Sequence, residues 1–190
     1  GLTMIKFDST YLNFKDTLFC GQVFRFKPYK NGFMVFTLDK AAYCYNEGNT
    51  AIIESDDDNY FHNYFDLSRD YAQIIDSINA CNNEKVMLSA NTYKGIRILK
   101  QDKIEALLSF IVSQNNNIPR IKSIIEKLSA TFGEKKCFLG EDYFAFPTLK
   151  ALAEASYEDL KACGLGYRAE YIKETAQKLL LGELLLDDLD

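Results

Sequence analysis

The sequence predicts an α+β fold: an N-terminal antiparallel β-sheet domain with flanking helices, followed by an all-α domain. Two observations support this prediction. Residues 11–55 contain short segments rich in Phe, Tyr, Val and Ile that alternate with period two, as β-strands do. Residues 101–128 instead place apolar side chains at helical spacing. The change falls near residues 90–95, so we expect one domain at 1–94 and a second at 95–190.

Composition indicates a soluble globular protein, with 47% hydrophobic and 26% charged residues in 190. The sequence has no 18-residue apolar run and does not begin with a basic segment followed by an apolar one. We therefore expect neither a membrane span nor a signal peptide. The five cysteines are scattered without CxxC spacing, which favours reduced thiols and a cytoplasmic location. A single histidine, His62, cannot supply a metal cluster or a catalytic triad, so no metal and no cofactor are expected.

The first strands follow one another with short connections. Asn31-Gly32 is a strong hairpin signal and residues 46–49 mark another turn, so the sheet should be an antiparallel meander. Residues 1–3 are set aside in this assignment of strands. The expected strands are 22–27, 33–38, 41–46 and 50–54. Gly21 stands at the start of this sheet, where a glycine permits a bulge, a turn or the close approach of another group.

Three helices are expected between the sheet and the second domain. The acidic run at residues 55–58 could suggest a cation site, but capping of a helix over 60–67 is the simpler interpretation because acidic side chains complement a helix N-terminus. Ser68 should cap the next helix. That helix would turn Tyr71, Ile74, Ile75 and Ile78 inward. A short helix is expected over 84–90.

Residues 101–128 form the clearest pattern in the chain. The two apolar stripes predict two antiparallel helices, and Ser113 to Asn117 predict the turn between them. Pro119 fits the first turn of the second helix, where its missing N–H costs nothing. The stripes consist of Ile104, Leu107, Leu108, Ile111 and Val112, then of Ile121, Ile124, Ile125 and Leu128. The turn is either a polar loop that caps a helix hairpin or a recognition loop whose amides and arginine suit nucleobase edges and phosphates.

The net charge of −5 on its own argues against a nucleic-acid partner. Residues 94–128, however, hold seven basic side chains and three acidic ones, a local charge of +4 that leaves −9 for the rest of the chain. Such a stripe is compatible with binding a polyanion along one face, and equally with a solvated helix surface.

The chain after Leu128 should remain helical. We expect a break at Gly133, an aromatic loop over 143–147, a short helix capped by Thr148 and another that ends at residues 163–164. A final helix should start near Arg168. A cation at a helix start is disfavoured by about 0.3–1 kcal/mol, which an anionic or base-edge partner could offset.

Three motifs resemble one family. QDKIEALLSFIVSQNNNIPRI, preceded by Gly-Ile-Arg-Ile-Leu at 95–99, closely resembles the 8-oxoguanine DNA glycosylases of the helix-hairpin-helix glycosylase superfamily. Residues 20–25 are similar to the Gly-Gln-x-Phe-Arg strand of that family, and residues 164–169 to its Gly-Leu-Gly-Tyr-Arg-Ala turn. The motifs occur in family order. Phe26 stands where relatives often carry Trp.

The resemblance implies contacts with duplex DNA that contains a damaged base. The carbonyl of Gly21 would touch that base, and Asn115 would fill the gap left by its extrusion. Tyr167 would wedge beside the base left behind, while Arg120 and Arg168 would bond the opposite cytosine, a task that suits the fixed donor fork of arginine. We therefore expect residues 113–120 and 164–168 to converge on one surface, in a protein that acts as a monomer.

In this family the lesion is flipped out, and a lysine attacks the C1′ atom of the sugar to form a Schiff base that can lead to strand cleavage. That lysine lies in a Gly-Val-Gly-x-Lys hairpin and is assisted by an aspartate in a Val-Asp-x-His stretch. Neither motif occurs in this sequence, and Arg168 cannot replace the lysine because it stays protonated.

We therefore expect a truncated glycosylase and AP lyase of base excision repair, without a catalytic residue and inactive alone. Three alternatives stay open. The chain could be a non-catalytic DNA-damage-binding fragment, an alkyl-purine glycosylase on the same scaffold, or, from the acidic total, a protein-interaction domain.

Overall fold

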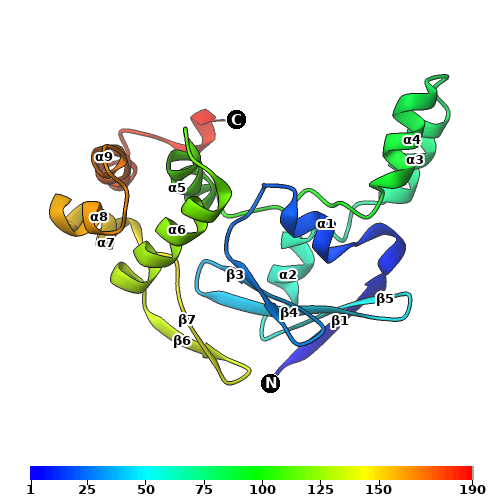
Figure 1. Cartoon of the computed structure of the whole chain (residues 1–190), viewed down its shortest axis with the longest axis horizontal. Coiled ribbons are helices and arrows are strands. Elements are labelled where there is room, and N and C mark those ends of the chain that lie inside the picture. Colours follow the sequence, from blue (N-terminus) through cyan, green and yellow to red (C-terminus); the bar gives the residue numbers. More distant parts are fainter. Residues whose placement is uncertain (190) are drawn as a thin grey trace. The chain divides into compact units, whose positions relative to one another are not determined.

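The computed structural model describes residues 1–189 and divides them into two compact units (Figure 1). Residues 1–35 and 41–100 form the first unit, and residues 36–40 with the chain from 101 onward form the second. The predicted α+β class is confirmed, with the antiparallel sheet in the first unit and most helices of the second arising from residues 103–181. No helix within residues 1–189 is long and apolar enough to cross a membrane.

The five-stranded sheet has the order β1-β5-β4-β3-β2. Its strands are β1 Thr3–Asp8, β2 Phe26–Tyr29, β3 Gly32–Thr37, β4 Lys40–Glu47 and β5 Thr50–Ser55. The predicted hairpins are confirmed: Tyr29 pairs with Gly32, and Glu47 pairs with Thr50. Strand β1 was not predicted, because we set residues 1–3 aside and began the β pattern at residue 11. It pairs antiparallel with β5 at the edge of the sheet.

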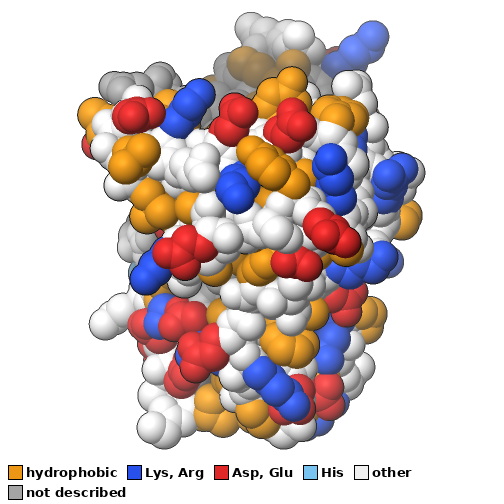
Figure 2. Space-filling view, turned by 90° about the vertical axis from the view of Figure 1, so that its left-hand side faces the viewer, with side chains coloured by type: hydrophobic (Ala, Val, Ile, Leu, Met, Phe, Trp, Pro, Cys, Tyr) orange, Lys and Arg blue, Asp and Glu red, His pale blue; other side chains and the backbone are white. Residues whose placement is uncertain are grey.

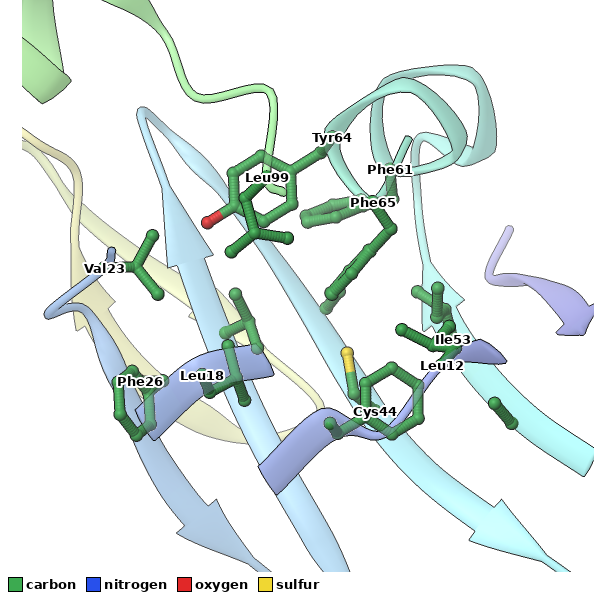
Figure 3. Packing of buried hydrophobic residues seen from close by; sticks show 14 of the residues in the cluster. Leu12, Leu18, Val23, Phe26, Cys44, Ile53, Phe61, Tyr64, Phe65 and Leu99 are labelled. Atoms are coloured by element: carbon green, nitrogen blue, oxygen red, sulfur yellow. The ribbon is translucent and has the colours of Figure 1, made fainter. Parts of the chain in front are cut away.

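Helices α1 (Phe14–Phe19) and α2 (Asp58–Tyr64) cover one face of this sheet. Figure 3 shows Leu18 of α1 and Phe61 of α2 packed over strand residues such as Cys44. The prediction of a strand over 22–27 was wrong for residues 22–25, and the β pattern also missed α1. The side chain of Asn13 caps this helix by accepting from the N–H of Asp16, which starts a helix that alternation alone does not reveal.

The acidic run before α2 is a capping sequence, as predicted. The Asp57 side chain accepts from the backbone N–H of Tyr60. A helix N-terminus leaves N–H groups without partners, and an aspartate there satisfies one of them while opposing the positive end of the helix dipole. Within residues 1–189 no cluster of three or more potential ligands could hold a metal ion.

Helices α3 (Tyr71–Asn79) and α4 (Glu84–Thr92) pack against each other, and Asn91 donates to Asn79 at 2.7 Å. The cap of α3 is Asp70, not Ser68 as predicted. The expectation that its apolar residues turn inward holds for Tyr71, whose hydroxyl donates to Asp66 at 3.0 Å, but not for Ile74, which is 40% exposed; neither helix has a fully buried residue. The predicted periodicity is present, but α3 packs mainly against α4, and this leaves its apolar stripe half covered.

Residues 95–100 belong to the first unit because their side chains complete it. Arg97 and Leu99 are buried, and the backbone N–H of Asn13 donates to Gly95 at 2.8 Å. Gln22 also binds this segment: its amide donates to the carbonyl of Arg97 at 2.8 Å and accepts from the N–H of Leu99 at 3.0 Å. The contacts therefore divide the chain after Lys100, a few residues beyond the expected boundary at 94 and 95.

Asp66 should make the stability of the first unit depend on pH. Burial alone would raise the pKa of this carboxyl, but hydrogen bonds from Lys100 and Tyr71 and the charge of Arg69 hold it below its ordinary value of 3.8. A depressed pKa contributes stability above the unfolded-state value that is lost as the pH falls through the folded-state value. We expect the free energy of unfolding to fall by about 1–3 kcal/mol on this account when Asp66 is protonated.

The variant Asp66→Asn isolates that contribution. Asp66 has φ 54°, and asparagine tolerates this left-handed conformation, so the substitution changes charge with little backbone strain. Urea titrations at pH 7 and near pH 3 should show a large loss for the natural sequence and a smaller loss for the variant. An equal loss in both proteins would show that Asp66 does not carry the dependence.

The second unit contains five α-helices within residues 101–189 and a β-hairpin. The helices are α5 Lys103–Ser113, α6 Ile118–Phe132, α7 Leu149–Glu154, α8 Tyr157–Ala162 and α9 Arg168–Leu181; the strands are β6 Lys135–Phe138 and β7 Glu141–Phe144. The predicted helical domain is confirmed, with the correction that it is not purely α-helical, since it also holds this hairpin. The hairpin turns at Leu139 and Gly140, both with positive φ, and its four-residue strands are too short for alternation to be seen in sequence.

Residues 36–40, the tip of the β3–β4 hairpin, are part of this unit. The buried carboxylate of Glu105 on α5 accepts from the N–H of Leu38 at 2.7 Å, and the Tyr143 hydroxyl donates to the carbonyl of Asp39 at 2.8 Å. Phe36 stacks on Tyr143 with ring centroids 5.0 Å apart. These contacts explain why a segment from the sheet region clusters with the helices.

Candidate nucleic-acid interface

The turn between α5 and α6 contains three asparagines with different surroundings. Asn117 caps α6 by accepting from the N–H of Arg120 at 3.1 Å, and Asn116 donates to the carbonyl of Val112 at 3.1 Å. Pro119 lies in the first turn of α6, as predicted. Asn115 is exposed, has φ 50°, and no hydrogen bond to its side chain is found within residues 1–189. Two asparagines thus build the turn, and Asn115 leaves an amide available for a partner.

The turn between α8 and α9 uses two glycines with positive φ, Gly164 at 91° and Gly166 at 56°. Tyr167, at the start of α9, has 57% of its surface exposed, and its ring lies 6.3 Å from that of Tyr171. Because tyrosines four residues apart share a helix face, the two rings form a small aromatic surface beside the turn.

Arg168 joins the two turns. It is only 6% exposed, its Nε donates to the carbonyl of Gln114 at 3.2 Å, and its Nη2 donates to the carbonyls of Gln114 and Asn115. Those carbonyls follow the C-terminus of α5, where the helix dipole is negative, so the cation is favourably placed there although it opens α9. The predicted convergence of the turns is confirmed, and the partner that offsets the cost of this cation is a helix end.

Two exposed apolar side chains flank the α5–α6 turn and were not predicted from the sequence. Phe110 in the last turn of α5 is 60% exposed and Ile118 at the start of α6 is 51% exposed. The available signal was that Phe110 lies off the buried stripe of α5. Arg120 is also exposed on the first turn of α6. Exposed rings beside an amide and a guanidinium suit unstacked bases and phosphates.

Gly21 lies in the first unit, whereas the two turns lie in the second. Its φ is 89°, and a Cβ atom built there would meet nothing within 4 Å, so the glycine serves the backbone conformation and not a close contact in this structure. Gln22, the residue after Gly21, helps to hold this conformation, because its side-chain amide donates to the carbonyl of Thr17 at 2.9 Å. The carbonyl of Gly21 is thus part of an ordered, exposed turn.

The expected basic stripe of residues 94–128 is reduced by the structure. Arg97 is fully buried, and Lys100 pairs with Asp66 at 3.0 Å. Lys103 lies 3.4 Å from Asp187. Burial lowers the pKa of Lys122, which lies half-buried on α6. Figure 2 shows basic and acidic side chains interspersed over the face that it presents, so no single charge dominates there.

The largest cavity described in the second unit lies elsewhere. It measures about 580 Å³ and is lined by residues such as Ile104, Phe132 and Phe146. Ile104 belongs to the first turn of α5 and Phe132 ends α6, so the cavity is at the ends of these helices that are opposite to Asn115. The candidate interface is therefore an exposed surface and not this cavity.

Comparison with known families agrees with the fold. Residues 108–189 match the family model of HhH-GPD superfamily base excision DNA repair proteins, which defines the class. Residues 4–107 match that of the 8-oxoguanine DNA glycosylase N-terminal domain. The second match covers more than half of the chain, and the chain belongs to the 8-oxoguanine DNA glycosylase family within that superfamily.

Similar proteins are found among both curated sequences and solved structures. The N-glycosylase/DNA lyase of Saccharomyces cerevisiae is 46% identical over 89 residues, which are 46% of this chain and 24% of the yeast protein. The structure of MBOgg1 with a low-affinity DNA ligand gives a TM-score of 0.89 at 35% identity, over 98% of this chain and 66% of that one. The Clostridium acetobutylicum 8-oxoguanine glycosylase/lyase, bound to double-stranded DNA with cytosine opposite 8-oxoG, gives 0.86 at 34%, over 97% and 67%.

The aligned segments cover about a quarter of the length of the Saccharomyces cerevisiae and Arabidopsis thaliana relatives.

Proposed function

We propose that the protein acts in base excision repair and recognises oxidised guanine in duplex DNA. In the whole protein, the damaged base would be excised with an associated AP lyase step. The observation that carries the proposal is the hydrogen bonding of Arg168 to the α5–α6 turn, which joins the turn of the exposed Asn115 to the start of α9, next to the exposed Tyr167. The family to which the chain belongs supports the substrate class.

Each residue then has a physical task. The Asn115 amide can both donate and accept, so it can fill the position that an extruded base leaves in the stack. The ring of Tyr167 can stack against the neighbouring pair. Arg120, and an unused edge of Arg168, can donate to the acceptors of the unpaired cytosine through a planar fork. The carbonyl of Gly21 would accept from the damaged base. The partner would be a lesion-containing duplex bound by a monomer in the cytoplasm.

Residues 1–190 would supply recognition and not the nucleophile, since the lysine hairpin of the family is absent from the sequence. This separates the proposal from its alternatives. A non-catalytic DNA-damage-binding fragment would bind the same duplexes, but the whole protein would not excise the base. An alkyl-purine glycosylase would prefer an alkylated base, and binding of duplexes with 8-oxoguanine, 3-methyladenine or guanine distinguishes the two.

Substituting Arg120 by Ala should weaken binding to a lesion opposite cytosine by about 1–3 kcal/mol and should weaken binding opposite other bases much less. The reason is that a bidentate contact to cytosine is lost whereas the phosphate contacts are retained. Fluorescence anisotropy with four duplexes that differ only in the opposite base measures this. Lys127, exposed on the same helix, is a better control than the half-buried Lys122, and Lys127→Ala should act evenly on all four. Equal losses for Arg120→Ala would mean that this arginine only holds phosphate.

A further inference from the structure

We propose that Arg168 is a positioning residue that holds Asn115 in its DNA-binding conformation. The inference rests on the proposed function for its consequence in DNA binding, and on the geometry of the second unit for its cause. The resemblance implies that Arg168 contacts the orphan cytosine. The structure adds a separate task, which Arg168 performs before any duplex binds.

Arg168 is fixed by its surroundings. The guanidinium is buried, and its ring contact with Tyr167 has the Cζ atom 4.6 Å from the centroid. The described hydrogen bonds use Nε and Nη2, and all of them end on the carbonyls of Gln114 and Asn115. Removing the guanidinium would leave these carbonyls to find other donors at a helix C-terminus, where unpaired acceptors are already in excess.

Asn115 needs such support. Its φ of 50° is in the left-handed region, which costs a residue with a side chain about 1–2 kcal/mol, although asparagine tolerates it better than most. A conformation of this kind persists when the surrounding structure determines it. Arg168 supplies this support, because it donates to the carbonyls on both sides of the Asn115 α-carbon.

The other hydrogen bonds of the turn are local. Gln114 donates to the carbonyl of Phe110, Asn116 donates to that of Val112, and Asn117 accepts from Arg120. They connect the turn to α5 and α6, the two helices that it joins. Within residues 1–189, the hydrogen bonds described between residues 114–117 and a third helix are those of Arg168 on α9. Arg168 therefore holds the backbone that presents the exposed Asn115 amide. Because this backbone is ordered before DNA binds, less conformational entropy is lost on binding.

Hydrogen exchange of the 190-residue chain without DNA tests the cause. In Arg168→Met, exchange at the N–H groups of Gln114, Asn117 and Arg120 should rise about tenfold, the factor equivalent to one net hydrogen bond of about 1.4 kcal/mol. Arg120→Met, the same change of residue type at an exposed site next to the turn, should leave Gln114 and Asn117 unaffected. Arg168→Lys keeps the charge but not the fork, and should give an intermediate increase. It also replaces Arg168→Met if that variant exchanges throughout the second unit.

A double-mutant cycle tests the consequence, with a duplex that carries a tetrahydrofuran abasic analogue opposite cytosine as the probe. Asn115→Ala and Arg168→Met should each weaken binding. The double variant should bind clearly less weakly than the product of the two single losses, because Arg168 acts partly through Asn115 and partly through its own contact with the cytosine. Multiplicative losses, or unchanged exchange at the turn in both Arg168 variants, would overturn the inference. If the natural chain does not prefer this probe over intact duplex, the proposed function fails, and the exchange result alone decides whether Arg168 positions the turn.

Discussion

Replacing Arg97 by Met should lower the free energy of unfolding of the first unit by about 3–5 kcal/mol. The side chain is fully buried and binds four backbone carbonyls: Nε donates to Phe65 at 2.9 Å, Nη1 to Tyr11 at 2.9 Å, and Nη2 to Asp66 at 2.5 Å and Arg69 at 3.0 Å. Its Cζ atom also lies 3.8 Å from the ring centroid of Tyr71. Methionine would fill much of the volume and leave these carbonyls without donors.

Urea unfolding followed by far-UV circular dichroism measures the effect. The matched control is Arg69→Met, since Arg69 pairs with Asp66 at 3.3 Å but is 61% exposed, and exposed ion pairs contribute about 0–1 kcal/mol. Arg97→Lys should recover only part of the loss, because an ammonium cannot reach carbonyls in the pattern of a planar fork. A loss below 1 kcal/mol for Arg97→Met would show that water or local movement replaces the guanidinium.

The second large effect is a complete absence of covalent trapping. Borohydride reduction of a mixture of this chain and 8-oxoguanine duplex should give no crosslinked product, whereas a family member with the lysine hairpin should give one under the same conditions. A Schiff base requires a neutral amine near pH 7 held at bonding distance from C1′. A solvated lysine has a pKa near 10 and is almost entirely protonated at that pH.

Lys122 is the residue on which this prediction could fail. Burial lowers the pKa of its amine, and it lies on α6, the helix that begins beside the α5–α6 turn. An adduct that appears with the natural chain and disappears in Lys122→Met would identify this lysine as a nucleophile. An adduct that persists in the variant would point to another lysine, and in either case recognition without chemistry would be the wrong description of these residues.

Sequence reasoning predicted the parts of the fold that depend on local chemistry. The Asn-Gly hairpin, the Asp57 cap and the two apolar stripes around the Asn-rich turn each determine a structure within a few residues. It failed where partners distant in sequence decide. Strand β1 exists because β5 offers it an edge, and the apolar stripe of α3 is only half covered because this helix packs mainly against α4. Neither feature can be predicted from the sequence of the segment alone.

The site divides in the same way. Local turn signals predicted the Asn115 and Tyr167 turns, because both are tight turns next to strong helices, and the resemblance to the family implied their convergence. The role of the arginines could not be assigned from sequence. Arg97 was counted as part of a basic surface and is buried, and the apparent cost of a cation at Arg168 is offset by the C-terminal end of α5. A sequence shows that a residue is an arginine, but the acceptors of Arg97 and Arg168 are backbone carbonyls of other elements, which the sequence does not identify.

The most direct test of a lesion-binding surface at the α5–α6 and α8–α9 turns is an amide chemical-shift map of the 190-residue chain. Duplex with 8-oxoguanine opposite cytosine would be titrated into labelled protein, with the unmodified duplex as the reference. We predict that the lesion-specific shifts concentrate at residues 113–120 and 164–171, while the α3–α4 hairpin at residues 71–92 stays unchanged. Lesion-specific shifts confined to α3 and α4, or to the second-unit cavity lined by Ile104, Phe132 and Phe146, would contradict this account.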